Sequence, residues 1–479
     1  MRIFALTAGL LLAGCSMNPR LAAPAAPVAA AYPSAAATET GNAADLGWRE
    51  LFGDPRLQRL IELALTDSRD LRIAVLNVET ARAQARIQRS NQLPQVNANG
   101  SYSRQRTPSS VAGAGVGLGP GQSGADGFEV GQFSAQAALS AFEIDLFGRL
   151  RSQSQAAFER YLASTEGRRA TQITLIGAVA DAYLAERLAE EQLRLTETTL
   201  ADWRSSLEIA RKLRAALQNS GLEVAQAEGQ VQQAEADLEE RKRALQQATN
   251  ALTLVVGATP PADLPSPIVL MDQPIPTQLP AGLPSDLLER RPDIRQAEHE
   301  LAASNADIGA ARAAFFPRLS LTGAFGFASL GLSNLFDGAN QNWSFSPQIT
   351  APIFQGGQLK GNLELARIRK SLAIANYEKA IQTAFREVAD GLAARATYDH
   401  QQAAQANMVQ VAGRRLQLSE LRYRAGMDSR LELLDAQRSH YAARRTLLEV
   451  RRANLSAVVG LYRALGGGVD ISGITPAAK

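Results

Sequence analysis

The sequence predicts a mainly helical, internally duplicated chain that also carries four membrane β-strands. Three observations lead to this fold class. First, the sequence repeats itself at a constant shift of 223 residues (70 to 293). The run Asp70-Leu71-Arg72, followed by Arg89 and Pro94, corresponds to Asp293-Ile294-Arg295, followed by Arg312 and Pro317. Each copy then contains a very long stretch without proline, which predicts one long helix. Before each long stretch, two segments alternate apolar with polar or small residues, as half-exposed strands do.

Composition agrees with long helices and excludes several function classes. The chain has 479 residues, of which only 6% are aromatic, and its 50 basic and 47 acidic side chains leave a net charge of +3. This balance is too small for a nucleic-acid-binding surface, so we expect no nucleic-acid partner. The three histidines, His299, His400 and His440, are far apart in the sequence and predict no metal site.

The N-terminus has the pattern of a secretory signal, predicted over 1–14. Arg2 supplies the charge, an apolar run from Ile3 to Ala13 follows, and Leu12-Ala13-Gly14-Cys15 has the small residues of a cleavage site. Cys15 is the only cysteine, so it forms no disulfide within the chain. Its setting resembles the bacterial lipobox, in which the cysteine is acylated. Residues 15–45 are then a lipidated tether rich in alanine and proline, with little to pack.

The first structural repeat is predicted over 46–259. A helix from Leu71 to about Ser90 ends before Pro94. Val96–Tyr102 and Phe133–Ala141 are expected to be strands joined by a glycine-rich loop, and the second strand ends at the run 142–148. One helix from Leu150 to Ala216 would measure roughly 100 Å at 1.5 Å per residue. It turns near Asn219 and Ser220 and returns from Leu222 to about Val256, which gives an antiparallel helical hairpin.

A proline-rich segment, 260–284, is predicted to be an extended linker to the second structural repeat, 285–468, and 469–479 is a C-terminal tail. The repeat has the same plan. Its expected elements are a helix from Asp286 to Ala314, strands over Leu319–Phe327 and Trp343–Ile353, a helix from Leu363 to Ala425 and its return from Leu431 to Leu465.

Four strands of about ten residues have the length of outer-membrane barrel strands. Backbone groups in lipid must all be hydrogen-bonded, so an open sheet of four strands cannot stand alone there. Strands from several chains must close one barrel, of eight strands from two chains or twelve strands from three. Only the larger barrel readily leaves a water-filled passage.

With these segments in hand, the chain resembles the TolC-like outer-membrane efflux factors, and among them the lipoprotein channels, of OprM and NodT type, of resistance-nodulation-division drug pumps. The resemblance covers nearly the whole mature chain. Five stretches carry it: 142–151 (FEIDLFGRLR), 283–294 (LPSDLLERRPDI), 310–317 (AARAAFFP), 377–382 (YEKAIQ) and 434–439 (LDAQRS).

The resemblance implies a homotrimer with a twelve-stranded barrel in the outer membrane and an α-helical tunnel across the periplasm. Its partners would be a periplasmic membrane-fusion adaptor, an inner-membrane transporter of the resistance-nodulation-division class and outer-membrane lipid. The implied function is a passive exit duct for drugs or other small molecules, without cofactor apart from the covalent lipid on Cys15. The rival hypotheses are a periplasmic structural lipoprotein without a pore and the outlet of a type I protein secretion system.

The resemblance also places a gate at the far turns of the long helices. Tyr423 and Gly426 match the family's Tyr-x-x-Gly turn, and Leu431, Glu432 and Asp435 match the residues that line the closed periplasmic end. Three Asp435 carboxylates around a threefold axis would repel unless protonated or bridged by cations, so the constriction would attract cations and respond to pH. The plainer alternative is that Glu432 and Asp435 are solvated acids in a helix's first turn.

The first turn offers Glu223 and Gln226 at the matching positions, and Glu223 is a candidate acceptor for a hydrogen bond from Tyr423. This turn departs from the family pattern because Leu217 stands where the second copy has Gly426. We therefore expect Asn219 or Gly221 to supply the left-handed residue. We find no paired carboxylates, serine triad or metal-ligand spacing with supporting context, so no enzymatic activity is predicted.

Overall fold

The computed structural model describes residues 17–22, 24–29, 32, 46–108, 128–218, 220–277, 279 and 290–467. The expected signal peptide, Cys15, Asn219 and the C-terminal tail 469–479 lie outside the described residues. The chain forms two compact units: unit 1 comprises 1–23, 80–161 and 299–374, and unit 2 comprises 24–79, 162–298 and 375–479.

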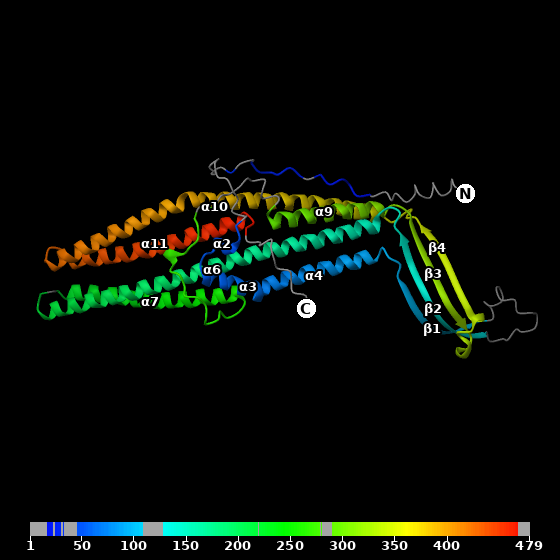
Figure 1. Ribbon diagram of the computed structural model, residues 1–479, viewed down its shortest axis with the longest axis horizontal. Coiled ribbons are helices and arrows are strands. Elements are labelled where there is room, and N and C mark those ends of the chain that lie inside the picture. Colours follow the sequence, from blue (N-terminus) through cyan, green and yellow to red (C-terminus); the bar gives the residue numbers. More distant parts are fainter. Residues whose placement is uncertain are drawn as a thin grey trace, which may run out of the picture. The chain divides into compact units, whose positions relative to one another are not determined.

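Unit 1 contains one four-stranded antiparallel sheet whose strands lie side by side in chain order (Figure 1). The strands are β1 (Val96–Thr107), β2 (Phe128–Ile144), β3 (Arg318–Ser329) and β4 (Gln341–Thr350). The structure thus has all four strands that the alternating pattern predicts. The last one, β4, ends at Thr350, before the expected Ile353. Within the described residues, β1 pairs only with β2 and β4 only with β3, so the backbone of each outer strand has one unpaired edge.

Large apolar side chains on this sheet remain exposed. Trp343, Phe345 and Ile349 on β4 and Phe325 on β3 all point away from any core, with Trp343 72% exposed. A bulge between Leu139 and Phe142 shifts the register of β2 against β3. A surface of this kind, apolar and unpaired at both edges, is incomplete in water.

Each pair of strands is flanked by helices that run out of the sheet. α4 (Arg69–Ser90) leads into β1, α6 (Arg149–Ala215) leaves β2, α9 (Pro292–Ala313) leads into β3 and α10 (Gln358–Arg424) leaves β4. Gly148 (φ 74°) and Gly357 (φ 88°) take left-handed conformations where the chain turns from strand to helix. Arg149 fixes the first of these turns with a bidentate ion pair to Glu143, at 2.9 and 2.6 Å.

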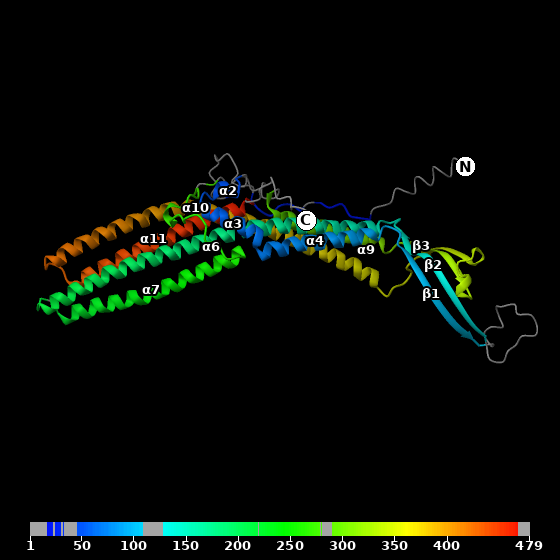
Figure 2. The same ribbon diagram turned by 60° about the horizontal axis from the view of Figure 1, so that its bottom comes forward.

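Unit 2 contains two antiparallel helical hairpins. α6 returns as α7 (Gly221–Val256), α10 returns as α11 (Arg430–Ala464), and both views show each pair side by side (Figures 1 and 2). The short helices α2 (Trp48–Leu51) and α3 (Pro55–Asp67) pack on them. The core combines residues of both copies, for example Trp48, Leu60, Tyr183, Val388 and Leu455.

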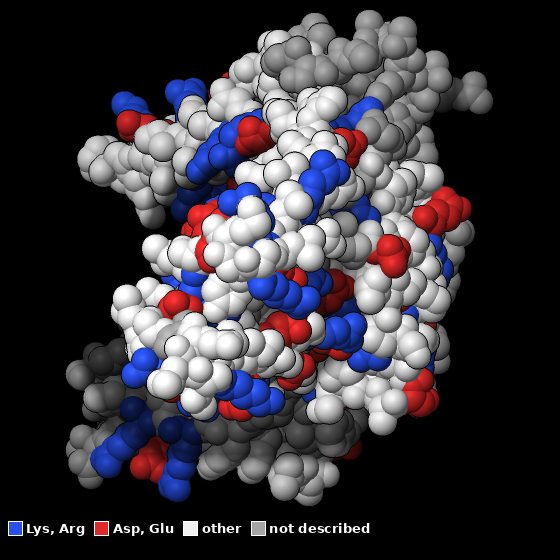
Figure 3. Space-filling view, turned by 90° about the vertical axis from the view of Figure 1, so that its left-hand side faces the viewer, with Lys and Arg blue, Asp and Glu red and all other residues white. Residues whose placement is uncertain are grey.

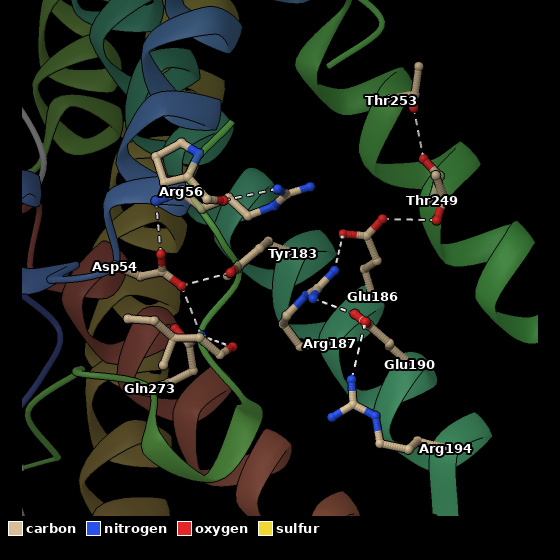
Figure 4. A network of polar contacts seen from close by, with 12 residues as sticks. Asp54, Arg56, Tyr183, Glu186, Arg187, Glu190, Arg194, Thr249, Thr253 and Gln273 are labelled. Carbon is tan, nitrogen blue, oxygen red and sulfur yellow. Dashed lines mark hydrogen bonds and ion pairs between the residues drawn. The ribbon is translucent and has the colours of Figure 1, made fainter. Parts of the chain in front are cut away.

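A network of polar contacts crosses this core (Figure 4). The Asp54 carboxylate caps α3 by accepting from the backbone N–H of Arg56 (2.8 Å), and it also accepts from the Tyr183 hydroxyl (2.7 Å) and the Gln273 amide (2.9 Å). Burial and the neighbouring Asp54 carboxylate raise the pKa of Tyr183 well above its usual range. On α6, Arg187 pairs with Glu186 and Glu190, so its buried charge is compensated.

Gln273 belongs to the proline-rich linker, and its place in this network corrects one prediction. The expected extended linker instead packs: it includes the short 3-10 helix η2 (Leu270–Asp272), and Leu270, Ile275 and Leu279 are buried in the unit 2 core. Apolar residues spaced between the prolines gain enough burial to hold the segment down. Two further 3-10 turns, η3 (Leu332–Asn334) and η4 (Gly338–Asn340), lie between β3 and β4.

The tether and the helix before β3 also differ from expectation. Tyr32 is buried and stacks on Phe385, so the tether is not free of packing. The helix expected from Asp286 is interrupted at Arg291, and α9 begins at Pro292, because proline has no N–H to donate and disfavours helix at the residue before it. Residues 281–289 lie outside the described part.

No helix among the described residues is both long and apolar enough to cross a membrane.

Candidate functional site

The two helical turns of unit 2 have the same backbone. At the end of α6, the N–H of Leu217 donates to Arg214 O (3.0 Å) and that of Gln218 to Leu213 O (2.9 Å). At the end of α10, the equivalent bonds run from Gly426 to Tyr423 O (3.0 Å) and from Met427 to Arg422 O (2.9 Å). Both are Schellman caps, in which the last helical carbonyls are satisfied by a left-handed residue and its successor.

The left-handed residue of the first turn is Leu217 itself, with φ 59°. The prediction that Gly221 supplies this residue is therefore wrong, and the same prediction for Asn219 is untested because Asn219 lies outside the described residues. Gly221 instead begins α7. Leu217 adopts the conformation that Gly426 adopts at φ 71°, and its side chain is 90% exposed. A Cβ in this region costs roughly 1–2 kcal/mol, which the two cap hydrogen bonds offset.

Both return helices begin with a serine cap. The Ser220 hydroxyl accepts from the backbone N–H of Glu223 (3.2 Å), and the Ser429 hydroxyl accepts from that of Glu432 (3.4 Å). These caps fix the first turn of each helix and thereby the direction of the acids that follow. Leu431 remains 61% exposed at the start of α11.

An arginine that we did not predict joins the two acids of the second turn. The Nη2 atom of Arg415, on α10, lies 2.8 Å from Glu432 Oε1 and 2.7 Å from Asp435 Oδ2 on α11. These hydrogen bonds raise the pKa of Arg415 above its usual value. The cluster therefore has one positive charge for two carboxylates, which leaves it a net charge of about −1 rather than −2.

A contact between the two hairpins supports the predicted partner of Tyr423. The Tyr423 hydroxyl donates to Glu223 Oε2 at 3.2 Å, which joins α10 to α7. Burial is the main reason that the pKa of Tyr423 is raised, and the nearby Arg430 opposes the shift. Gln226 lies half-buried on α7, and no hydrogen bond among the described contacts joins it to Tyr423. The assignment of these residues as a gate latch stays a prediction.

Arg430, at the start of α11, makes a second set of contacts at this end of unit 2. Its side chain is only 3% exposed, its guanidinium lies 5.4 Å from the centre of the Tyr423 ring, and its Nη2 donates to Ser206 of α6 at 2.6 Å. The hydrogen bond to Ser206 thus holds α11 against the first hairpin, and the cation–π contact with Tyr423 holds it against α10 of its own hairpin. Its Nε has no partner among the described atoms.

A cleft of about 410 Å³ lies beside Arg430, between α6, α10 and α11. Trp203, Tyr441 and His440 line it, and the Trp203 and Tyr441 rings make an edge contact with centroids 6.0 Å apart. Burial and the nearby Arg444 lower the pKa of His440, so this side chain is neutral at pH 7. The two hairpins border the cleft from opposite sides, and the contact between Trp203 on α6 and Tyr441 on α11 joins them beside it.

The end of unit 2 that carries both turns shows charges of both signs close together (Figure 3). Arg422 and Asp428 add one such pair, bidentate at 2.8 Å for both bonds, and Arg422 lowers the pKa of Asp428. Among the residues that the structure describes, no group of three or more histidine, cysteine, aspartate or glutamate side chains could hold a metal ion. The charged pairs at these turns can attract and repel ions.

The fold and this site define a class: outer-membrane export channels, in which a β-sheet region continues into long helical hairpins that end in polar turns. The family of outer membrane efflux proteins matches residues 60–258 and 283–467. The antibiotic efflux pump outer membrane protein ArpC of Pseudomonas putida is 45% identical over 463 residues, which are 96% of this chain and 93% of ArpC.

Two further relatives agree. The toluene efflux pump outer membrane protein TtgC of Pseudomonas putida is also 45% identical over 463 residues, 96% of this chain and 93% of its own length. The open state of the Neisseria gonorrhoeae MtrE outer membrane channel superposes with a TM-score of 0.85 at 39% identity, over 95% of this chain and 98% of that one.

The chain belongs to the outer membrane efflux protein family. It is a non-enzymatic transport protein of the outer membrane that extends into the periplasm, and it is the outer-membrane channel of a tripartite efflux pump, working with adaptor and inner-membrane components. The resemblance stated from sequence is thereby confirmed, as are the fold class, the function and the localisation. The roles assigned to individual gate residues remain predictions.

Proposed function

We propose that three copies of this chain, anchored by lipid on Cys15, form a passive exit duct for small apolar or amphipathic compounds. The observation that carries this proposal is the sheet of unit 1, whose two outer strands each have an unpaired edge. In a membrane such edges must be satisfied, and threefold rotational symmetry satisfies them when the β1 edge of one copy pairs with the β4 edge of the next. Three copies give twelve strands, which is wide enough for a water-filled lumen.

The proposed substrates follow from the relatives. ArpC is named for antibiotics and TtgC for toluene. The chain would receive such compounds from an inner-membrane transporter of the resistance-nodulation-division class through a membrane-fusion adaptor. The duct itself needs no binding pocket of high affinity, because directional transport is driven by the pump.

The gate of this duct would be the second helical turn. Glu432 and Asp435 of each chain, with Arg415 between them, would surround the axis and leave a net negative ring. Such a ring favours cations over anions and becomes less selective as the carboxylates are protonated. Tyr423 and Glu223 would hold the two hairpins of one chain together in the closed state.

The proposal is tested with the purified full-length protein. We expect an oligomer of three chains by native mass spectrometry, which dissociates on heating in detergent, and cation-selective single channels in planar bilayers. In cells lacking the native channel, the chain should restore resistance to antibiotics or solvents only together with its adaptor and pump. A monomer that inserts into lipid without conducting ions contradicts the proposed trimeric duct.

A further inference from the structure

A groove of about 570 Å³ runs between α4 and α6 in unit 1. Four arginines line it: Arg82, Arg86 and Arg89 from α4, and Arg151 from α6. We call it the arginine groove. Phe158, which is 51% exposed, and Tyr161 complete its apolar side, and no acidic residue is among the described residues that line it.

The positive charge of the arginine groove is poorly compensated. Arg151 lies 3.6 Å from Asp145, and Arg82 lies 5.9 Å from the centre of the Tyr161 ring. Arg86 and Arg89 form no ion pair with any described residue. The three arginines of α4 follow each other at intervals of four and three residues, so they share one helix face and repel each other. A bound anion would relieve this repulsion.

The N-terminal segment meets α6 at the edge of the groove. Gln155 lines the groove and also accepts a hydrogen bond from Asn18 at 2.8 Å, and Ser152 donates to Asn18 at 2.8 Å. Asn18 lies three residues after Cys15, the proposed lipid attachment site. A face reached directly by a lipid anchor is the outer face of a duct, turned toward membrane and periplasm.

Two of these arginines, Arg89 and Arg151, lie close to the strand ends, which sets their depth in a membrane that the sheet would span. Arg89 lies seven residues before the start of β1 at Val96, and Arg151 lies seven residues after the end of β2 at Ile144. The polar layer on each side of a bilayer's hydrocarbon core is roughly 6 Å thick. Arg89 lies in the last turn of α4, which ends at Ser90, and Arg151 lies in the first turn of α6, which begins at Arg149, so a sheet that spans the hydrocarbon brings these two guanidinium groups close to the headgroups.

We propose that the arginine groove binds the phosphate of an anionic phospholipid in the leaflet that faces the periplasm. Arg86 and Arg89 would bind the phosphate oxygens, since guanidinium groups match phosphate geometry, while Phe158 contacts the glycerol and acyl region. This inference rests on the proposed function, which places the sheet in the membrane. A neighbouring copy is the less suitable occupant, because the exposed apolar residue Ile87 lies on the other side of α4 and offers the better contact for a second chain.

The test compares lipid retention in full-length oligomers. Wild-type protein and the variant R82Q/R86Q/R89Q are purified into micelles with equal amounts of phosphatidylglycerol and phosphatidylcholine, and bound lipid is counted by native mass spectrometry. We expect the wild type to retain phosphatidylglycerol with at least about a tenfold preference, and the variant to lose it. The control R72Q/R243Q/R414Q removes the same charge from exposed arginines elsewhere and should keep the preference.

Each other outcome is decisive. Equal retention by wild type and groove variant, or equal loss in the control, overturns the proposal. Inorganic phosphate replacing chloride at matched ionic strength should leave the bound lipid in place; displacement would mean that the groove binds free phosphate instead. Single-channel recording of the same samples separates the two proposals: oligomers that conduct without lipid preference refute only the lipid site, while the absence of any conducting oligomer refutes the proposed duct.

Discussion

The two helical turns of unit 2 share a backbone and differ in chemistry. A shift of 209 residues (217 to 426) aligns Leu217 with Gly426, Glu223 with Glu432, and Gln226 with Asp435. Both turns close with the same Schellman bonds and the same serine caps. After duplication, the scaffold of the turn was therefore retained while its charges diverged.

The divergence gives each turn a separate task. Ser206 occupies the position that corresponds to Arg415, so the first turn lacks the arginine that joins the acids of the second. Glu223 instead accepts from Tyr423, and Ser206 accepts from Arg430, so both residues of the first hairpin bind the second hairpin. The first turn thus supports the second, and the second presents the charged cluster to solvent.

The largest expected effect comes from removing the acids of the second turn. E432A/D435A should raise single-channel conductance and weaken cation selectivity, because the negative groups are lost and Arg415 is left alone. The matched change in the first turn, E223A/Q226A, should leave ion selectivity nearly unaltered. Planar-bilayer recordings of both variants give the answer, and equal effects of the two would remove the distinction between the turns.

Removing Arg415 should change ion selectivity in the direction opposite to removing the two acids. R415Q keeps both carboxylates but removes their compensating charge, so the permeability ratio of cations to anions should rise about two- to fivefold, as expected of one exposed charge. Reversal potentials in asymmetric salt measure this ratio. R211Q, which breaks an exposed ion pair of the first hairpin, is the control. A fall in the ratio for R415Q contradicts our account of the cluster.

Exchange at the left-handed positions tests whether the two backbones are equivalent. L217G should stabilise the first turn by about 0.5–1 kcal/mol, since glycine lacks the Cβ penalty but loses more entropy on folding. G426L should destabilise the second turn by about 1–2 kcal/mol. Amide hydrogen exchange at the two turns reports both changes. Stabilisation by both substitutions, or by neither, would mean that the caps differ in ways that the hydrogen bonds do not reveal.

The smallest expected effect concerns the contact between the hairpins. Y423F removes one hydrogen bond to a carboxylate at 3.2 Å, worth about 1 kcal/mol, and should increase the fraction of time that channels are open by up to about fivefold. E223Q retains an acceptor and should have a smaller effect. Unchanged gating in both variants leaves the bond as a packing contact and excludes it as a latch.

Sequence reasoning found what has a periodic or local signal. The long helices and the four strands follow from the spacing of apolar residues, prolines and glycines along the chain. It failed where a residue adopts a backbone conformation that its type disfavours. Leu217 takes the left-handed conformation that usually belongs to glycine, and the tertiary structure decides which residue after a helix does so.

Contacts between distant segments were also missed. Leu270 and Gln273 lie among prolines, and the composition of their segment hid the fact that they reach the core. Arg415 is a different case, because it precedes the turn at Gly426 by 11 residues (415 to 426), whereas Glu432 and Asp435 follow it by 6 and 9 residues (426 to 432 and 426 to 435) on the facing helix. Writing the hairpin as two facing helices would have brought the three residues together.

The two unpaired edges of the four-stranded sheet have a genetic consequence. If each wall of a shared lumen is contributed by a different polypeptide, one mutant subunit impairs the whole channel, including its wild-type subunits. A cell expressing normal and altered alleles side by side would then build mostly mixed assemblies. Substitutions along the outer strands, β1 and β4, should consequently behave as dominant, whereas changes that prevent a chain from folding at all should be recessive.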